Sequence, residues 1–204
     1  MTDRIASAAG IVRRWVALYV PVAAVLLGAS TAVGFLLGNA VPLESLPTAP
    51  DGGADPFGPT ELTTTAIAVN NLTAMLVMLL GAVTLGIVSV FGLVLNGLLI
   101  GAVVGLALQE LPVVVVLALL IPHGILEIPA LLLVAAVGLR FGRLTVRYLR
   151  DREPELVTER RLREAGWLVV LSTLLILVAA YIEATITLQV AERVAGGPIT
   201  PVGR

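Results

Sequence analysis

The segment IPHGILEIPA, residues 121–130, contains the only histidine of the chain, His123, and a carboxylate, Glu127. Both lie in a run that is otherwise almost wholly apolar. Residues four apart share one face of a continuous helix, so the imidazole and the carboxylate can reach each other. A hydrogen-bonded structural pair is the simplest role, because it satisfies both groups without a metal.

Two functional roles stay open for this pair. In a divalent metal site, zinc for example, His123 and Glu127 would each give one ligand. Zinc sites normally have three or four protein ligands, and other carboxylates such as Glu110 and Glu183 are distant in the sequence, so one protomer looks insufficient and a two-fold dimer would complete the set. In a proton relay, the pair would be joined by Glu183 of the last apolar segment, although Glu183 alone is expected near the outer interface.

Three amides lie in or beside the apolar segments. Asn70 and Asn71 stand near the start of the second segment, and Asn96 follows in the third. We expect them to form an intramembrane polar cluster with His123 and Glu127. Amides in lipid cap helices or bond across them, which contributes about 0.6 kcal/mol on average. A structural role is favoured over ligand binding.

The composition indicates that these polar groups belong to a membrane protein. Hydrophobic residues make up 58% of the 204 residues and charged residues 13%, and the mean hydropathy is +1.01. Soluble domains carry about 25% charged residues. Most of the surface is therefore expected to face a lipid bilayer.

A helix crosses a bilayer with about 20 apolar residues, and five stretches of the sequence qualify. They predict an all-α, polytopic membrane protein that forms one domain over residues 1–204. The fourth stretch is longer than one perpendicular span, and its prolines favour a helix broken near Pro122. The expected spans cover about residues 15–38, 63–90, 91–108, 113–139 and 167–190, with an external loop at 39–62 and a polar helical connector at 140–166.

Charge predicts the orientation. Eight of the thirteen arginines lie between Arg140 and Arg163, and basic residues in short loops mark the cytoplasmic side. We therefore expect a multi-pass protein of the cell membrane with a cytoplasmic N-terminus and an external C-terminus. Trp15 and Trp167 stand at the two cytoplasmic entries, where interfacial aromatic residues are common.

Small residues recur in the third span. Gly97, Gly101 and Gly105 follow one another at intervals of four, a pattern that lets two helix backbones approach closely. The partner helix belongs either to this chain or to a second protomer of a homodimer.

Enzyme signatures are missing from the sequence. It has no cysteine, no phosphate-binding glycine loop, no paired-histidine zinc helix and no serine elbow. We therefore expect a non-enzymatic protein with no resident cofactor, unless a metal binds at His123 and Glu127. The arginines of the connector alternate with acids, which favours lipid headgroups or a protein partner over nucleic acid.

The order of these features resembles the stage II sporulation protein M family of integral membrane proteins. The resemblance covers about residues 63–145 and rests on Asn70-Asn71, Asn96-Gly97 with Gly101, Pro122-His123-Gly124 with Glu127, Pro129-Ala130, and Gly138. It implies a helical membrane scaffold. The sporulation member of the family works with two cell-wall-degrading enzymes during engulfment, so the resemblance implies that the loops of this chain recruit other membrane or envelope proteins. The alternative is a transporter or channel with a proton or metal path through His123 and Glu127.

Overall fold

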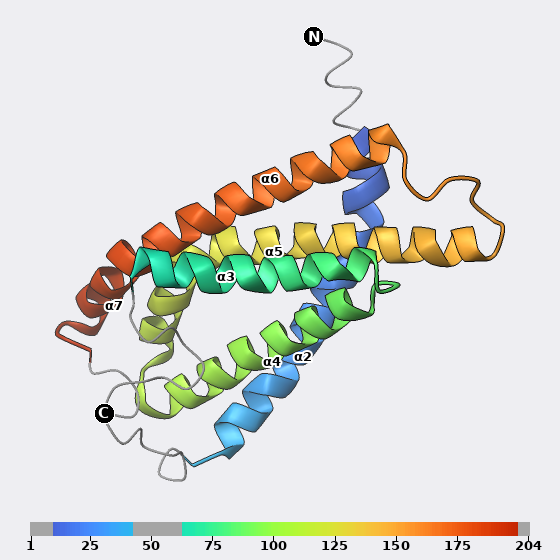
Figure 1. Ribbon diagram of the computed structural model, residues 1–204. Helices are drawn as coiled ribbons and strands as arrows, with labels where there is room; N and C mark the ends of the chain where they lie inside the picture. The colour runs from blue at the N-terminus through green and yellow to red at the C-terminus, as the bar shows by residue number, and fades with distance from the viewer. Residues whose placement is uncertain (1–9, 43–62, 200–204) are drawn as a thin grey trace.

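The protein is described by a computed structural model covering residues 10–42 and 63–199. Every regular element in these two ranges is helical (Figure 1). In chain order the elements are η1 (Val12–Val16), α2 (Ala17–Ala40), α3 (Thr64–Leu79), η3 (Leu80–Ala82), α4 (Ile87–Glu110), α5 (Val113–Leu149), α6 (Glu159–Ile182), η4 (Glu183–Thr187) and α7 (Leu188–Ala195).

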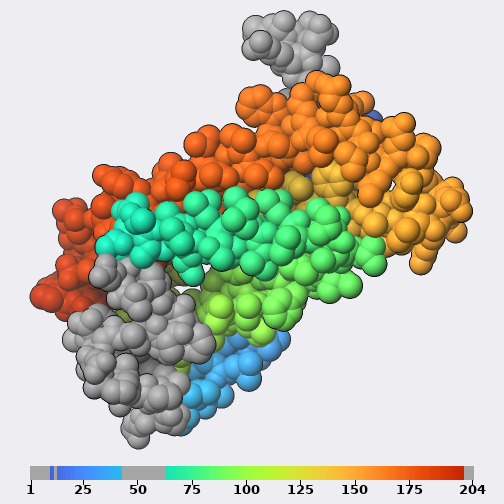
Figure 2. All heavy atoms as spheres, in the orientation of Figure 1, coloured from blue at the N-terminus to red at the C-terminus, as the bar shows by residue number. Residues whose placement is uncertain are grey.

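Five helical segments of the described residues are long and apolar enough to cross a membrane, which confirms the predicted fold class. Large apolar side chains on them remain exposed, for example Leu76 at 59% and Trp167 at 66%. The helices α3 and α6 lie side by side (Figure 2). Exposed apolar surface of this extent is stable in lipid but not in water. Most of the predicted external loop lies outside the described residues.

The central helix α5 contacts each of α2, α3, α4 and α6. It is one helix from Val113 to Leu149 and contains Pro122 and Pro129. The expected break takes the form of a bend, because the first turns of α5 run at an angle to the rest (Figure 1). Each proline lacks the N–H that would bond to the preceding turn, and this is a common cause of helix kinks.

The predicted connector, residues 140–166, is a helical hairpin. The helix α5 continues to Leu149, and α6 begins at Glu159. The Thr158 side chain caps α6 by accepting a hydrogen bond from the Arg161 backbone N–H at 3.2 Å. Pro154 lies in the loop between the two helices. A proline is favoured there because it has no backbone N–H to donate to a helical hydrogen bond.

The helices α2 and α4 cross at very short range because glycines line their contact. A Cβ placed on Gly101 would lie 2.0 Å from the Thr31 carbonyl oxygen, and one on Gly105 would lie 2.5 Å from the Phe35 carbonyl oxygen. A Cβ on Gly97 would meet the Ser30 hydroxyl at 2.0 Å. The partner of the Gly97, Gly101 and Gly105 stripe is therefore α2 of the same chain.

The turn between α3 and α4 packs against α5. It lies just before Ile87, so the second and third spans meet several residues before the expected boundary near residue 90. Gly86 adopts a φ of 87° there, which glycine accepts without strain. A Cβ on Gly142 of α5 would lie 2.3 Å from the Gly86 nitrogen, so glycine is needed on both sides of this contact. Asn96 lies inside α4 rather than in the turn.

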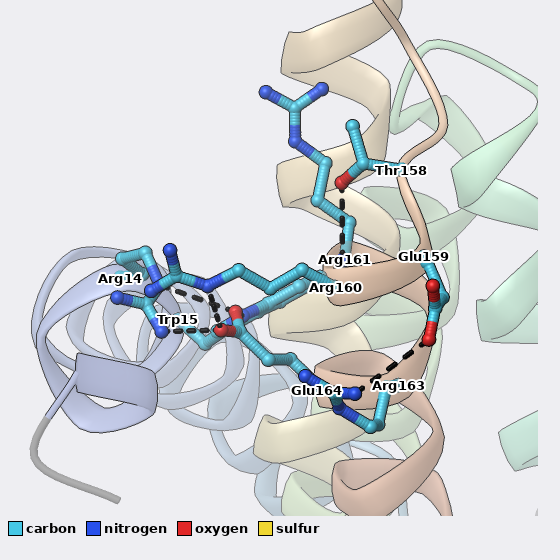
Figure 3. A network of polar contacts seen from close by, with 8 residues as sticks. All are labelled: Arg14, Trp15, Thr158, Glu159, Arg160, Arg161, Arg163 and Glu164. Atoms are coloured by element: carbon cyan, nitrogen blue, oxygen red, sulfur yellow. Dashed lines mark hydrogen bonds and ion pairs between the residues drawn. The ribbon is translucent and has the colours of Figure 1, made fainter. Parts of the chain in front are cut away.

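The arginine-rich end of the bundle contains a polar network between the first span and α6 (Figure 3). The Glu164 carboxylate accepts hydrogen bonds from Trp15 Nε1 at 2.7 Å, from Arg160 at 2.9 Å and from Arg14. Trp15 is fully buried, with the Arg140 guanidinium 4.1 Å from the centre of its ring. Trp15 therefore joins the start of the first span to α5 and α6 instead of anchoring it in the headgroup region, whereas Trp167 is exposed.

The crossing of α2 and α4 gives the first prediction. Gly101→Ala places a methyl group against backbone that a side-chain rotation cannot clear, and we expect it to lower the free energy of unfolding by about 1–3 kcal/mol. Gly28→Ala on α2 is the control, since a Cβ there meets nothing within 4 Å. Both are measured by reversible unfolding in mixed micelles. Equal stability of the two variants would show that the crossing is looser than described.

The Glu164 network gives the second prediction. Glu164→Gln removes the charge that three donors share, and we expect a loss of about 2–3 kcal/mol in the same assay. Glu159→Gln is the matched control. Its side chain is 94% exposed, so the change should stay within about 0.5 kcal/mol. A Glu164→Gln variant as stable as wild type would mean that the network does not hold the helices together.

Candidate functional site

The histidine and the two acids of the apolar segments meet in one place. His123 and Glu127 lie one turn apart on α5, and Glu183 begins the η4 segment of the last span. Ligand atoms of the three side chains lie within 4.8 Å of one another, and each side chain is half-buried. We call these residues the His–Glu–Glu triad. Two of its members come from one helix and the third comes from another.

A local irregularity of the last span places Glu183. The segment Glu183–Thr187 is a π-helix between α6 and α7. Such wide turns are uncommon, add one residue to a turn, and occur often at functional sites. Its first residue is the triad acid, and its last, Thr187, is buried and contacts the triad. The wide turn therefore presents two polar side chains to α5.

Thr187 orients the imidazole. Its hydroxyl donates to the Ile182 carbonyl oxygen at 3.3 Å and lies 3.4 Å from Nδ1 of His123. Because the hydroxyl proton is used toward Ile182, the oxygen acts as acceptor toward the ring. This arrangement favours the tautomer with the proton on Nδ1, which leaves the Nε2 lone pair free for a proton or a metal ion.

The triad lies far from the arginine-rich end. Glu127 precedes Arg140 by thirteen residues on α5, a length of about 20 Å at about 1.5 Å per residue. The hydrocarbon region of a bilayer is about 30 Å thick. If a bilayer boundary lies at Arg140, this length would place the triad within the hydrocarbon region, toward the opposite side. Ionisable groups at such a depth need a partner, a proton or a metal.

The three asparagines have local hydrogen-bond partners. Asn96 donates to the Gly92 carbonyl oxygen of its own helix at 2.8 Å. Asn70 donates to the Asn71 side-chain oxygen at 3.4 Å, and Asn71 is buried. No hydrogen bond within residues 10–42 and 63–199 connects these amides to His123 or the two acids.

The arrangement suits a small divalent cation. Zinc binds imidazole nitrogen and carboxylate oxygen at about 2.0–2.2 Å, so tetrahedral ligand atoms stand about 3.4 Å apart. The triad atoms, within 4.8 Å of one another, reach that spacing by small side-chain rotations. One imidazole with two carboxylates, and no thiolate, also suits manganese or ferrous iron. Three ligands leave room for water or a fourth group.

Sequence reasoning found His123 and Glu127 by their spacing. It set Glu183 aside as a distant carboxylate and named it only as a relay candidate, whereas the structure brings it next to the pair. Its contact with the pair depends on how the last span packs against α5, which spacing does not reveal. The sequence feature that pointed to Glu183 was its position as a lone acid in the apolar stretch after Tyr181. The Trp15–Glu164 bond was missed because its two residues lie in different spans.

Comparisons with known proteins identify the family of this chain. The family model described as stage II sporulation protein M matches residues 22–188. An uncharacterised protein of Methanocaldococcus jannaschii is 35% identical over 127 residues, which cover 62% of this chain and 71% of that protein. A second uncharacterised protein of the same organism is 34% identical over 131 residues, which cover 62% of this chain and 56% of that protein. No solved structure matches. The chain belongs to the stage II sporulation protein M family of membrane proteins.

Proposed function

We propose that this protein is a non-enzymatic membrane organiser in which the His–Glu–Glu triad binds one divalent cation, such as zinc, as a clamp between helices. The observation that carries the proposal is the meeting of two ligands from α5 with one from the last span. A cation held by both segments would fix their relative position. That position would also determine where α7 stands, because α7 continues directly from η4.

Electrostatics supports a clamp rather than a bare cluster. The two carboxylates, which lie within 4.8 Å of each other and of the imidazole, repel each other when both are ionised, and apolar surroundings strengthen that repulsion. A divalent cation would neutralise both acids. The Thr187 hydroxyl beside Nδ1 would play the part of the outer hydrogen bond that usually orients a metal-binding histidine.

The proposal includes an orientation and partners. The arginine-rich end, with the α5–α6 hairpin, would face the cytoplasm, and the triad would lie toward the external side of the cell membrane. The protein would act as a homodimer, or with other membrane or envelope proteins, through its loops. The α2–α4 glycine contact lies within one chain, so the dimer would use another face.

Metal content tests the clamp. We expect purified protein dialysed against zinc to retain about one equivalent, and we expect Glu183→Gln to bind zinc at least about tenfold more weakly, because it removes one of three ligands. Zinc should also raise the unfolding temperature of the wild type by mass action. Elemental analysis and thermal unfolding give the two readouts.

The control is Glu110→Gln, which removes an exposed acid at the end of α4. It should bind zinc as the wild type does. Equal zinc content in Glu183→Gln and wild type, or no stoichiometric zinc, manganese or iron in either, would overturn the clamp.

A second candidate function follows from the half-buried state of the triad. Groups that exchange protons or a cation within the membrane also serve transport, and π-helical turns often occur at such sites. Flux measurements in proteoliposomes separate the two functions. Proton or zinc uptake that is lost in His123→Ala would establish a conduit, whereas a clamp predicts tight binding without uptake.

Recruitment of partners gives a separate prediction. Affinity purification from membranes after chemical cross-linking should yield a homodimer or a reproducible partner. Recovery of the protein alone, as a monomer, would remove the organiser role. That outcome would leave metal binding by the triad to be decided by its own assay.

A further inference from the structure

A basic hollow opens at the end of the bundle opposite the triad. It has a volume of about 320 Å³ and is lined by residues of the first span, of α5 and of the start of α6. Six arginines line it, against one acid, Glu153. The arginines are Arg13, Arg14, Arg140, Arg143, Arg147 and Arg161.

Their placement concentrates positive charge between three segments. Arg140, Arg143 and Arg147 follow at helical intervals along one face of α5. Arg13 and Arg14 approach from the first span. Guanidinium groups repel one another across such a space unless an anion lies between them.

The acids nearby neutralise only some of these arginines. Glu153 pairs with Arg161 and, at 3.4 Å, with Arg147. The hydrogen bond from Arg161 lowers the pKa of Glu153, so this carboxylate is ionised at neutral pH. Arg13 and Arg143 form no ion pair with any residue of the described ranges, and both are exposed at the hollow.

Arg140 lines the hollow and also packs against Trp15. One of its terminal nitrogens, Nη1, is buried and has no hydrogen-bond partner among the described residues. Arg140 also lines a second hollow of about 260 Å³, beside Arg160 and Glu164. Its stacking on Trp15 fixes the guanidinium in place.

An apolar track leads away from the hollow along α2. Leu18 lines the hollow and is 48% exposed, Val22 is 45% exposed and Val25 is 70% exposed. The spacing of these residues places them on one face of α2. A ligand with a charged head in the hollow would therefore have an exposed hydrocarbon surface beside it for its tail.

We propose that this hollow binds the phosphate of an anionic phospholipid, with the acyl chains lying along the Leu18–Val22–Val25 face of α2. Guanidinium groups bind phosphate oxygens in pairs of parallel hydrogen bonds. Basic pockets between spanning helices bind anionic headgroups in membrane proteins generally. The shared chemistry is a phosphate, and the apolar track favours a lipid over free inorganic phosphate.

The test uses the full chain in mixed micelles, titrated with phosphatidylglycerol or phosphatidylcholine and followed by native mass spectrometry and thermal unfolding. We expect saturable binding of phosphatidylglycerol at least about tenfold tighter than that of phosphatidylcholine, because each charge-assisted contact alone contributes a factor of this size. The double variant Arg13→Gln and Arg143→Gln should lose that preference. Both side chains are exposed, so the variant should fold.

The matched control is the double variant Arg150→Gln and Arg163→Gln, which removes the same charge outside the hollow and should keep the preference. Equal binding of the two lipids by the wild type, which requires no variant, would overturn the proposal. So would an equal loss of preference in both double variants, since charge alone would then be responsible. Stabilisation by inorganic phosphate equal to that by phosphatidylglycerol would show that the ligand is a free anion and not a lipid.

Discussion

Hydrocarbon offers no hydrogen-bond partners, and this constraint decides where each polar group of the bundle lies. Backbone groups are satisfied within long helices, and the threonine and asparagine side chains in the spans bond mostly to carbonyl oxygens of their own helix. Ionisable groups cannot be satisfied in this way. Most of them gather in two places, the His–Glu–Glu triad and the arginine-rich end, and each place joins segments that are distant in the sequence.

The two polar sites depend on close backbone contacts between them. The α2–α4 crossing and the approach of Gly142 to the turn before α4 leave no space for side chains. They hold the first, third and fourth spans together. The fourth span therefore presents His123 and Glu127 at one end of a rigid unit and Arg140, Arg143 and Arg147 near the other.

Much of this architecture could be predicted from the sequence, because hydropathy and charge act locally. Length and composition predicted the five spans, and the polar stretch at 140–166 predicted a helical connector. The Gly97–Gly101–Gly105 stripe gave a close contact but not its partner. Two features depended on packing between distant segments: the contact of Glu183 with His123 and the burial of Trp15 against Glu164. The prolines of α5 predicted an interruption of that helix, which takes the form of a bend. A residue pattern within one span carries no information on which side chain of another span it will meet.

The triad as a metal ligand set is the central claim, and X-ray absorption at the zinc edge tests it most directly. On zinc-loaded protein, the account predicts a shell of nitrogen and oxygen at about 2.0–2.1 Å, with outer scattering from one imidazole that disappears in His123→Ala. A spectrum with water oxygens only, or an imidazole signal unchanged in His123→Ala, would contradict it.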